Sequence, residues 1–383
     1  MVLSVQSERG DKYMKQIMLF LAGVSLLLLP GCWDQSSLRD ARLIYGMAFD
    51  QAPQGKVKTT IVIRNMPAGD RKNPSNEVHS VIGNTARQTR DLLDSNISEK
   101  LETYKVRALL FGKEVAKKGI YPHLDVFYRD PRASLNSRIA VVDGEASQVF
   151  YLRRVGDTLI AEHVDEVLES EEDAGVLPET NVQSICSLLL EPGQDFLIPL
   201  LRKTESEEVA AVGTALFHGQ KWTGEFNRKE SVLYLMLTNE IEKKAQLTIK
   251  IHPQHGENPT SYITIDMLKP RLKREVKISS SGGVDVIFSG TVYAKVVEFP
   301  ENNLTDSDRL EQINHELSRA LTLEVKNMLD KMQQANCDAL SIGRHLAAFH
   351  PEFWKKQDWE KDYAKVRFHP QIKVKILETG IIF

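Results

Sequence analysis

The sequence predicts an α+β protein of several domains, three in number, in which mixed sheets carry packed helices. The chain has 383 residues, enough for two or three domains of about 150 residues each. Strand-like β-branched segments alternate with helical segments over roughly the first half. Strand-like segments then dominate until one long helical pattern near the C-terminus. That order predicts a C-terminal antiparallel sheet packed against a long helix.

The first domain, α/β in character, is expected over residues 32–204. Val57–Ile63 is rich in β-branched residues and is followed by the turn-like Met66–Gly69, which is typical of a strand. The polar stretch from Asn73 to Val81 indicates a loop. The remaining elements expected here are helices over 86–93, 114–118 and 120–127, and strands over 104–111 and 137–142.

A domain boundary is expected near residue 205, between Glu191-Pro192-Gly193 and the acidic stretch Glu205–Glu208. A small middle domain would then cover residues 205–260. It begins with strands over 210–217 and 222–226, whose short connection predicts a β-hairpin. An apolar helix over 230–237 and a strand over 247–251 complete it.

The third domain, α+β, is expected over residues 261–383. Strands are predicted over 262–266, 273–278, 284–287 and 290–299, with a loop at Ser279–Gly283. Thr305 and Asp308 give a capping-box signal for a helix over 307–334. Residues 372–376 alternate between apolar residues and lysine, which predicts a final strand with a basic outer face. The helix has one apolar stripe, formed by Leu310, Ile313, Leu317, Leu321, Val325, Met328 and Met332.

Residues 1–31 are expected to be a signal peptide. Ile17–Leu29 is an apolar run of 13 residues behind Lys12 and Lys15. A membrane-spanning helix needs about 20 residues, so the run is typical of a secretory signal. Met14 offers a second start, with a conventional signal of its own.

The run ends in Leu29-Pro30-Gly31-Cys32, which resembles the bacterial lipobox. The small Gly31 permits cleavage after it, and the Cys32 thiolate is nucleophilic enough to take an S-diacylglycerol group. An N-acyl chain such as palmitate completes the expected anchor, because stable anchoring takes more than one chain. The alternative is an uncleaved anchor, with Cys32 a bystander. Either interpretation places the rest of the chain outside the cytoplasm.

The composition of the chain limits the classes of protein to which it can belong. Hydrophobic residues make up 42% and charged residues 26% of the chain, and the net charge is −3. These values fit a globular protein and not a nucleic-acid binder. Cys186 and Cys337 are too few for a disulfide framework. Their pairing stays open, although two buried free thiols are favoured.

Most signatures of catalysis are absent: the chain has no G-x-G-x-x-G, P-loop, G-x-S-x-G or H-E-x-x-H. We therefore expect no enzyme activity, catalytic residue, metal site or cofactor. His252 and His255 have an H-x-x-H spacing, but a turn is favoured there. Glu162-His163 with Asp165 is a weak acid–base candidate, because adjacent helical residues face different ways. The acidic stretch 164–173 could bind a cation or a basic partner, and a solvated helix face is favoured.

Aromatic residues are concentrated near the C-terminus, from Phe349 to Tyr363. Phe353, Trp354 and Trp359 are candidates for a partner surface. Packing of these rings between the last helix and the last strand is the favoured alternative.

Four ordered segments carry a family resemblance. They are Gly31-Cys32-Trp33-Asp34, the G-x-E-x-A-x-x-G-I pattern within Tyr104–Asp130, the G-T-A-x-F pattern of Gly213–Phe217, and a C-terminal stretch with Asp338, Gly343-Arg344, His350-Pro351 and Trp354. Together they resemble the Ger(x)C family, the C-subunit lipoproteins of spore germinant receptors.

The resemblance implies a three-domain, non-enzymatic subunit that takes part in nutrient-triggered spore germination. It implies a lipid anchor on the outer face of the inner spore membrane, beside two integral membrane subunits of A and B type. The alternative is a substrate-binding lipoprotein of a membrane transporter, although no duplicated lobe is visible in the sequence. An extracytoplasmic hydrolase is a third, weaker possibility.

Overall fold

The computed structural model describes residues 14, 16–20, 41–65, 74–251, 256–280, 282–301 and 304–380. The first of these are helical and belong to the unit Met1–Ala41, whereas Arg42–Phe383 forms a second compact unit. Gly31, Cys32, His252 and His255 lie outside the described residues. Within the described ranges, no helix combines the length and the apolarity needed to cross a membrane.

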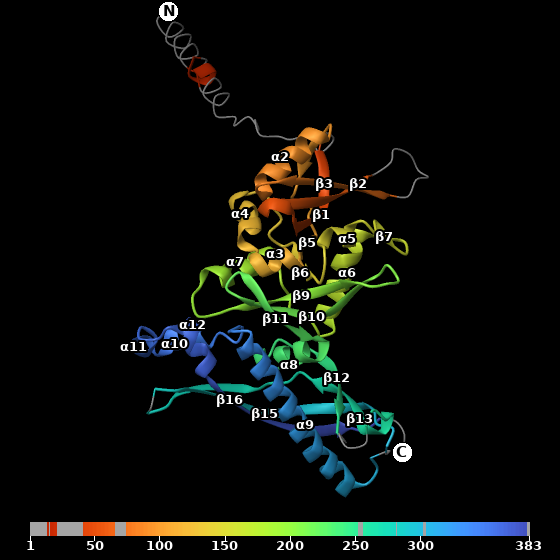
Figure 1. The fold of residues 1–383 in the computed structure, drawn as a ribbon, viewed down its shortest axis with the longest axis vertical. Helices are drawn as coiled ribbons and strands as arrows, with labels where there is room; N and C mark the ends of the chain where they lie inside the picture. Colours follow the sequence, from red (N-terminus) through yellow and green to blue (C-terminus); the bar gives the residue numbers. More distant parts are fainter. Residues whose placement is uncertain are drawn as a thin grey trace, which may run out of the picture. The chain divides into compact units, whose positions relative to one another are not determined.

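The larger unit contains a nine-stranded mixed sheet (Figure 1). Its four central strands are parallel, and antiparallel strands extend both edges. The order is β11 (Lys221–Asn227), β10 (Val209–His218), β9 (Phe196–Lys203), β6 (Arg138–Val142), β5 (Ala108–Gly112), β1 (Ala41–Gln51), β2 (Val57–Asn65) and β3 (Ser75–Gly83), and β4 (Lys100–Glu102) pairs with β1.

Helices cover both faces of this sheet, because its central strands are apolar on both sides. Ala48 and Leu110 pack into the core on one face, whereas Phe49 and Phe111 pack on the other. The Phe49 face is covered by α2 (Ala86–Asn96), α3 (Lys113–Lys118), α4 (Tyr121–Arg129) and α7 (Val182–Leu190). The Ala48 face is covered by α5 (Ala146–Phe150), α6 (Ile160–Asp173) and α8 (Arg228–Thr238).

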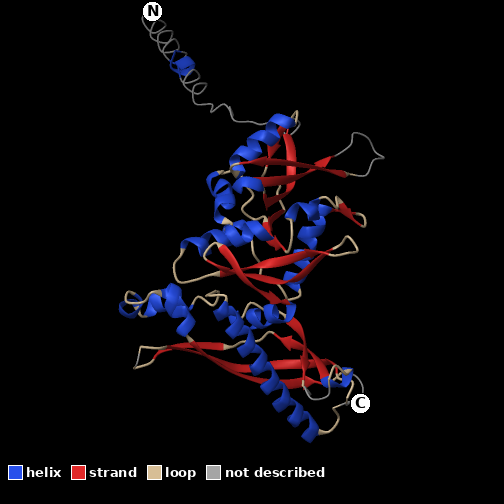
Figure 2. Ribbon diagram, in the orientation of Figure 1, coloured by secondary structure: helices blue, strands red, loops and turns tan. Residues whose placement is uncertain are grey.

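Helix α8 joins this sheet to the rest of the unit. All residues from Ser231 to Leu237 are buried, as expected of a helix that packs on all sides. It contacts β10 and β11 on one side, and α9 (Ser307–Gln334) and β12 (Lys244–Lys250) on the other (Figure 2). One hydrophobic core therefore runs through α8 and connects the two sheets.

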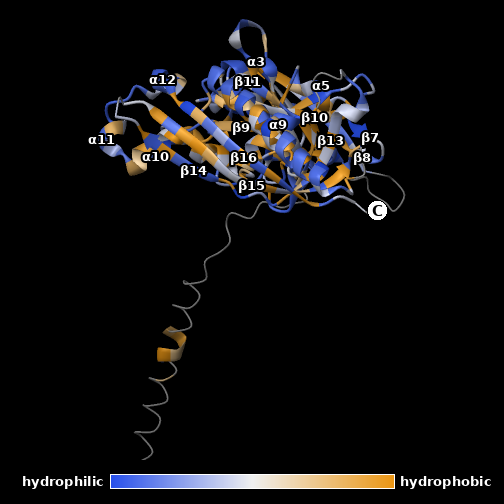
Figure 3. Cartoon of the chain, turned by 90° about the horizontal axis from the view of Figure 1, so that it is seen from below, coloured by the Kyte–Doolittle hydropathy of each residue, from blue (hydrophilic) through white to orange (hydrophobic). Residues whose placement is uncertain are grey.

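The second sheet has five strands. They are β12, β13 (Tyr262–Leu268), β14 (Lys273–Ile278), β15 (Val284–Glu298) and β16 (Arg367–Glu378). Helix α9 packs on this sheet through the predicted stripe, including Ile313, Leu321 and Met332. In Figure 3 surface stretches of α9 are hydrophilic, whereas the strands carry many of the hydrophobic residues. The α+β class, with mixed sheets and a long helix against the last sheet, is confirmed.

Helix α9 also covers the free edge of β16. Asn314, Ser318 and Thr322 accept hydrogen bonds from the backbone N–H groups of Ile376, Val374 and Ile372, at 2.9, 2.8 and 3.3 Å. The two repeats match, because four helical residues rise about 6.0 Å and two strand residues about 6.6 Å. These side chains therefore occupy an edge that would otherwise be open to strand pairing.

Short elements complete the unit. They are β7 (Arg154–Val155), β8 (Thr158–Leu159), η2 (Pro53–Gly55), η4 (Pro259–Ser261), α10 (Ile342–Phe349), α11 (Pro351–Trp354), α12 (Trp359–Asp362) and η5 (Tyr363–Lys365).

Several sequence predictions were wrong in detail. Residues 75–81 of the polar stretch expected as a loop belong to β3, which pairs with β2 over nine residues. This strand is polar because it lies at the edge of the sheet. The strand expected from Tyr104 begins only at Ala108. Residues 284–298 form one strand, β15, instead of two.

Two further corrections concern the third predicted domain. The side chain that caps α9 is that of Asp306, which accepts a hydrogen bond from the Asp308 backbone at 2.9 Å, so the predicted Thr305–Asp308 box is not the cap. Strand β16 runs parallel to β15, whereas the other strand pairs of this sheet are antiparallel. A parallel pair needs a long crossover, and α9 lies within it.

The expected boundary near residue 205 lies in the turn between β9 and β10, which pair with each other. Residues 205–260 contribute β10 and β11 to the first sheet and β12 to the second. The division into three domains stays a prediction.

Candidate functional site

Asp338 lies at the centre of a polar network in the unit Arg42–Phe383. At this network the half that contains the nine-stranded sheet meets the half that contains the five-stranded sheet. Its side chain caps α10: Oδ1 accepts a hydrogen bond from the Ile342 N–H at 2.9 Å, and Oδ2 accepts one from the Gly343 N–H at 2.8 Å. Oδ2 also accepts a hydrogen bond from Trp359 Nε1 at 2.9 Å. A carboxylate at a helix N-terminus is favourable because it satisfies N–H groups that lack helical partners.

Asp195, immediately before β9, forms the other half of the junction. Its N–H donates to the Asp338 carbonyl at 3.0 Å, and its Oδ2 accepts from the Asp338 N–H at 2.8 Å. Its Oδ1 accepts from the Gly219 N–H at 2.7 Å. Asp195 and Asp338 therefore hold each other's backbone although they are 143 positions apart in the chain.

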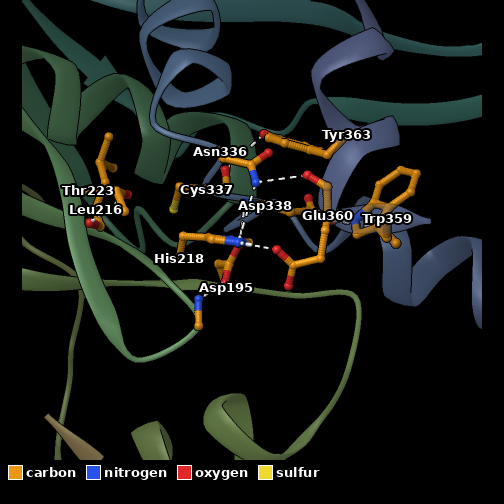
Figure 4. A network of polar contacts seen from close by, with 12 residues as sticks. Asp195, Leu216, His218, Thr223, Asn336, Cys337, Asp338, Trp359, Glu360 and Tyr363 are labelled. Atoms are coloured by element: carbon orange, nitrogen blue, oxygen red, sulfur yellow. Dashed lines mark hydrogen bonds and ion pairs between the residues drawn. The ribbon is translucent and has the colours of Figure 1, made fainter. Parts of the chain in front are cut away.

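His218, at the end of β10, connects this pair to α12. Its Nδ1 lies 3.2 Å from Asp195 Oδ2 and its Nε2 lies 2.9 Å from Glu360 Oε2. The hydrogen bonds to Asp195, and then to Glu360, raise the His218 pKa to about 9. At neutral pH the ring is a cation that donates from both nitrogens. We call Asp195, His218, Asp338, Trp359 and Glu360 the Asp338 junction (Figure 4).

Two glycines bring the chains close enough for this network. The Arg344 N–H donates to the Gly193 carbonyl at 2.6 Å. A Cβ on Gly193 would lie 2.8 Å from the Gly343 carbonyl carbon, and a Cβ on Gly343 would lie 2.5 Å from Trp359 Nε1. Close packing therefore requires a glycine at position 343 of the Gly343-Arg344 motif. Gly193, expected beside a domain boundary, belongs to this contact.

The aromatic residues near the C-terminus pack beside the junction. Trp354 and Trp359 have ring centroids 5.6 Å apart, and Trp359 and Tyr363 have centroids 5.9 Å apart. Trp354, Trp359 and Phe353 are half-buried against the core. Trp354 and Trp359 line a cavity of about 420 Å³ with the junction residues. Their packing is as favoured from the sequence, and a partner role stays a prediction.

Burial shifts the pKa values of two neighbouring residues at the junction. Burial raises the pKa of Asp338 to about 7 and that of the Cys337 thiol well above its usual value. The Cys337 thiol is therefore protonated, and its carbonyl accepts a hydrogen bond from the Tyr363 hydroxyl at 2.8 Å. Cys186 and Cys337 are both free. Both ring nitrogens of His218 are engaged, with Asp195 and with Glu360.

The other weak candidates are separated in the structure. In α6, Glu162 pairs with Arg64 at 3.0 Å, whereas Asp165 pairs with Arg138 at 2.7 Å. They therefore form no shared acid–base site. The acidic face is solvated only in part: Glu166, Glu169 and Asp173 are exposed, whereas Asp165 and Glu172 have side chains only 12% and 10% exposed.

Sequence reasoning missed Asp195 and His218 and gave no role to Asp338. Asp195 follows a Glu-Pro-Gly stretch that is typical of a linker, and His218 lies in a hairpin turn. The available signal was the cluster of Asp338, Gly343 and Trp354, all quoted for the family resemblance. Their partners come from distant parts of the chain, which periodicity does not reveal.

Comparisons with known proteins agree with the resemblance. Residues 34–203 match the model of the spore germination protein N-terminal domain, and residues 212–380 match that of the spore germination B3/GerAC-like C-terminal domain. Spore germination protein GerQC of Bacillus cereus is 23% identical over 96% of this chain and 99% of its own length. Spore germination protein KC of Bacillus subtilis is 22% identical over 91% of this chain and 92% of its own.

A solved structure supports the fold. The crystal structure of the GerBC protein superimposes with a TM-score of 0.58 at 17% identity, and covers 87% of this chain and 97% of that one. The two family models together cover most of the chain in the expected order. The chain belongs to the Ger(x)C family of spore germination proteins.

Proposed function

We propose that this protein is the lipid-anchored C subunit of a spore germinant receptor. It acts in nutrient-triggered germination by contact with two integral membrane subunits, of A and B type, and not as an enzyme. The Cys32 thiol carries the S-diacylglycerol group, and cleavage after Gly31 frees the Cys32 α-amino group for the N-acyl chain. The body then lies on the outer face of the inner spore membrane.

One observation carries this proposal: the chain matches spore germination proteins over nearly its whole length and theirs. The Asp338 junction supports a role in contact, because it binds the two halves of the body through reciprocal hydrogen bonds. A body held in this way can transmit a contact at one end to the other. The lipobox-like sequence supports attachment at a membrane.

The proposal is tested by deleting the gene in a strain without a redundant receptor. We expect normal sporulation and loss of the germination response to one nutrient class, measured as the fall in optical density after nutrient addition. Germination triggered by a non-nutrient germinant should stay intact. An unchanged response to every nutrient would contradict the proposal.

The anchor is tested separately with Cys32→Ala. We expect loss of metabolic lipid labelling and release from the membrane fraction, or impaired germination. Cys186→Ala serves as the matched control and should retain both label and membrane association. The lipoprotein assignment would be overturned if Cys32→Ala stayed fully in the membrane fraction and the wild-type protein carried no lipid label.

A further inference from the structure

An open groove of about 640 Å³ is formed between the outer surface of α9 and β16. Helix α9 runs along this strand and hydrogen-bonds to its edge (Figure 1). The apolar surface of the groove comes from Leu323, which is 58% exposed, and from Ile372, which is buried. Leu323 therefore presents its side chain at a hollow of the surface instead of packing into the core.

The charged side chains of the groove are all basic. Arg319 and Lys326 on α9 and Lys373 on β16 are exposed, and none of the three has an ion-pair partner among the described residues. His315 also lines the groove, and no aspartate or glutamate is among the described residues that line it. The groove therefore combines apolar surface with three cations that the described chain does not neutralise.

Two carboxylates on the same stretch of α9 are engaged elsewhere. Glu316 pairs with Arg309 at 3.5 Å, and Glu324 pairs with Lys229 of α8 at 2.6 Å. Because both are held in these pairs, neither neutralises the cations of the groove. Complementary charge guides protein contacts and selects the right partner, so the partner that fits this groove is acidic.

The spacing of the groove residues on α9 matches an extended chain. Arg319, Leu323 and Lys326 are four and three residues apart, so they follow one side of the helix over about 10.5 Å. Positions one, three and five of an extended segment span about 13 Å on one face. The flexible stems of arginine and lysine cover the difference. The complementary pattern is therefore acidic, apolar and acidic at alternate positions.

We propose that this groove docks an extended acidic segment of a partner protein. The apolar side chain of the segment packs against Leu323 and Ile372, and its carboxylates pair with the three cations. A protein segment is favoured over a lipid surface, because a single side chain can enter a hollow toward Ile372, only 3% exposed, which a flat surface would bridge. The inference rests on the proposed function, in which the chain acts by contact with partner proteins.

The test is fluorescence anisotropy with the full-length lipidated protein in a neutral detergent. The probe is a fluorescein-labelled peptide of sequence GDEALEEDG, and the matched neutral peptide is GNQALQQNG. We expect saturable binding of the acidic peptide that weakens as salt is added, and no binding of the neutral one. Binding is measured on the isolated protein, so its failure is distinguishable from an unchanged germination response after gene deletion.

Two variants locate the binding in the groove. Arg319→Gln with Lys326→Gln should weaken binding of the acidic peptide about fivefold or more, because two ion pairs are lost. Leu323→Ser should weaken it severalfold, because apolar contact is lost. The matched control is Lys105→Gln with Lys356→Gln, which removes the same charge from two exposed positions outside the groove and should change binding little.

Three results would overturn the proposal: no saturable binding of the acidic peptide, equal binding of the neutral peptide, or an equal effect of the groove variant and its control. These substitutions are on the surface, and circular dichroism would show that each variant is folded. Dihexanoylphosphatidylglycerol serves as the lipid probe. If it displaced the peptide and bound more tightly, with the same loss in the groove variant, the proposal would be overturned in favour of a lipid surface.

Discussion

Replacement of Asp338 by alanine removes the acceptor at the centre of the junction. Ile342 N–H, Gly343 N–H and Trp359 Nε1 lose their partner together. An unsatisfied buried donor costs about 1–3 kcal/mol. The half-exposed Trp359 regains water, so two donors count in full and the loss is about 2–6 kcal/mol.

This loss is measurable as a shift in melting temperature. The unit Arg42–Phe383 has 342 residues (383 − 42 + 1), for which the unfolding entropy is about 0.7 kcal/mol/K. The expected fall for Asp338→Ala is therefore about 3–8 °C by scanning calorimetry. Asp338→Asn keeps one acceptor oxygen and should lose about half as much.

The control is Asp285→Ala. Asp285 pairs with Arg367 and lies 2.8 Å from His369 Nε2, but these contacts are exposed, and exposed ion pairs contribute little. Its melting temperature should stay near that of the wild type. A fall for Asp338→Ala no larger than that for Asp285→Ala would refute the reasoning that the junction holds the two halves together.

Three further outcomes follow from the structure. The folded-state pKa of His218, about 9, is above its unfolded value, so its stabilisation is present below about pH 6.5 and lost as pH rises through 9. Between pH 7.5 and 9.5 the unfolding free energy should fall by about 1–3 kcal/mol in the wild type and stay flatter in His218→Gln, as measured by urea titration. Gly343→Ala should lower the unfolding free energy by about 1–3 kcal/mol through its clash with Trp359; wild-type stability would contradict the close contact. Ser318→Ala frees the Val374 N–H and should lower the unfolding free energy by about 1 kcal/mol. Light scattering should show added self-association of this variant through the edge of β16, and no increase would contradict the covering of that edge by α9.

Local patterns in the sequence predicted the elements whose stability is local. Helix α9 begins and ends where its apolar stripe predicts. The stripe repeats over 28 residues, and only a helix places all of its residues on one face that can be buried. The polar edge strand β3 was missed because β2 supplies its pairing and its own residues carry little apolar signal. The parallel direction of β16 depends on where α9 returns the chain, which alternation of residues does not encode.

The residues of the Asp338 junction likewise could not be predicted from local sequence patterns. Asp338 and Gly343 stand in a quoted family pattern, yet their roles depend on Asp195 and Trp359, which come from other parts of the chain. His218 would be a surface turn residue without Glu360, 142 positions away. Long-range pairs of this kind follow from the packing of the two sheets through α8, and not from any local motif.

The central claim is that this protein acts beside two membrane subunits of a germinant receptor. Chemical cross-linking in isolated inner spore membranes, followed by purification of the tagged protein and mass spectrometry, tests it most directly. We predict cross-links to integral subunits of A and B type that disappear in Cys32→Ala. Cross-links to a transporter permease, with none to those subunits, would contradict the claim.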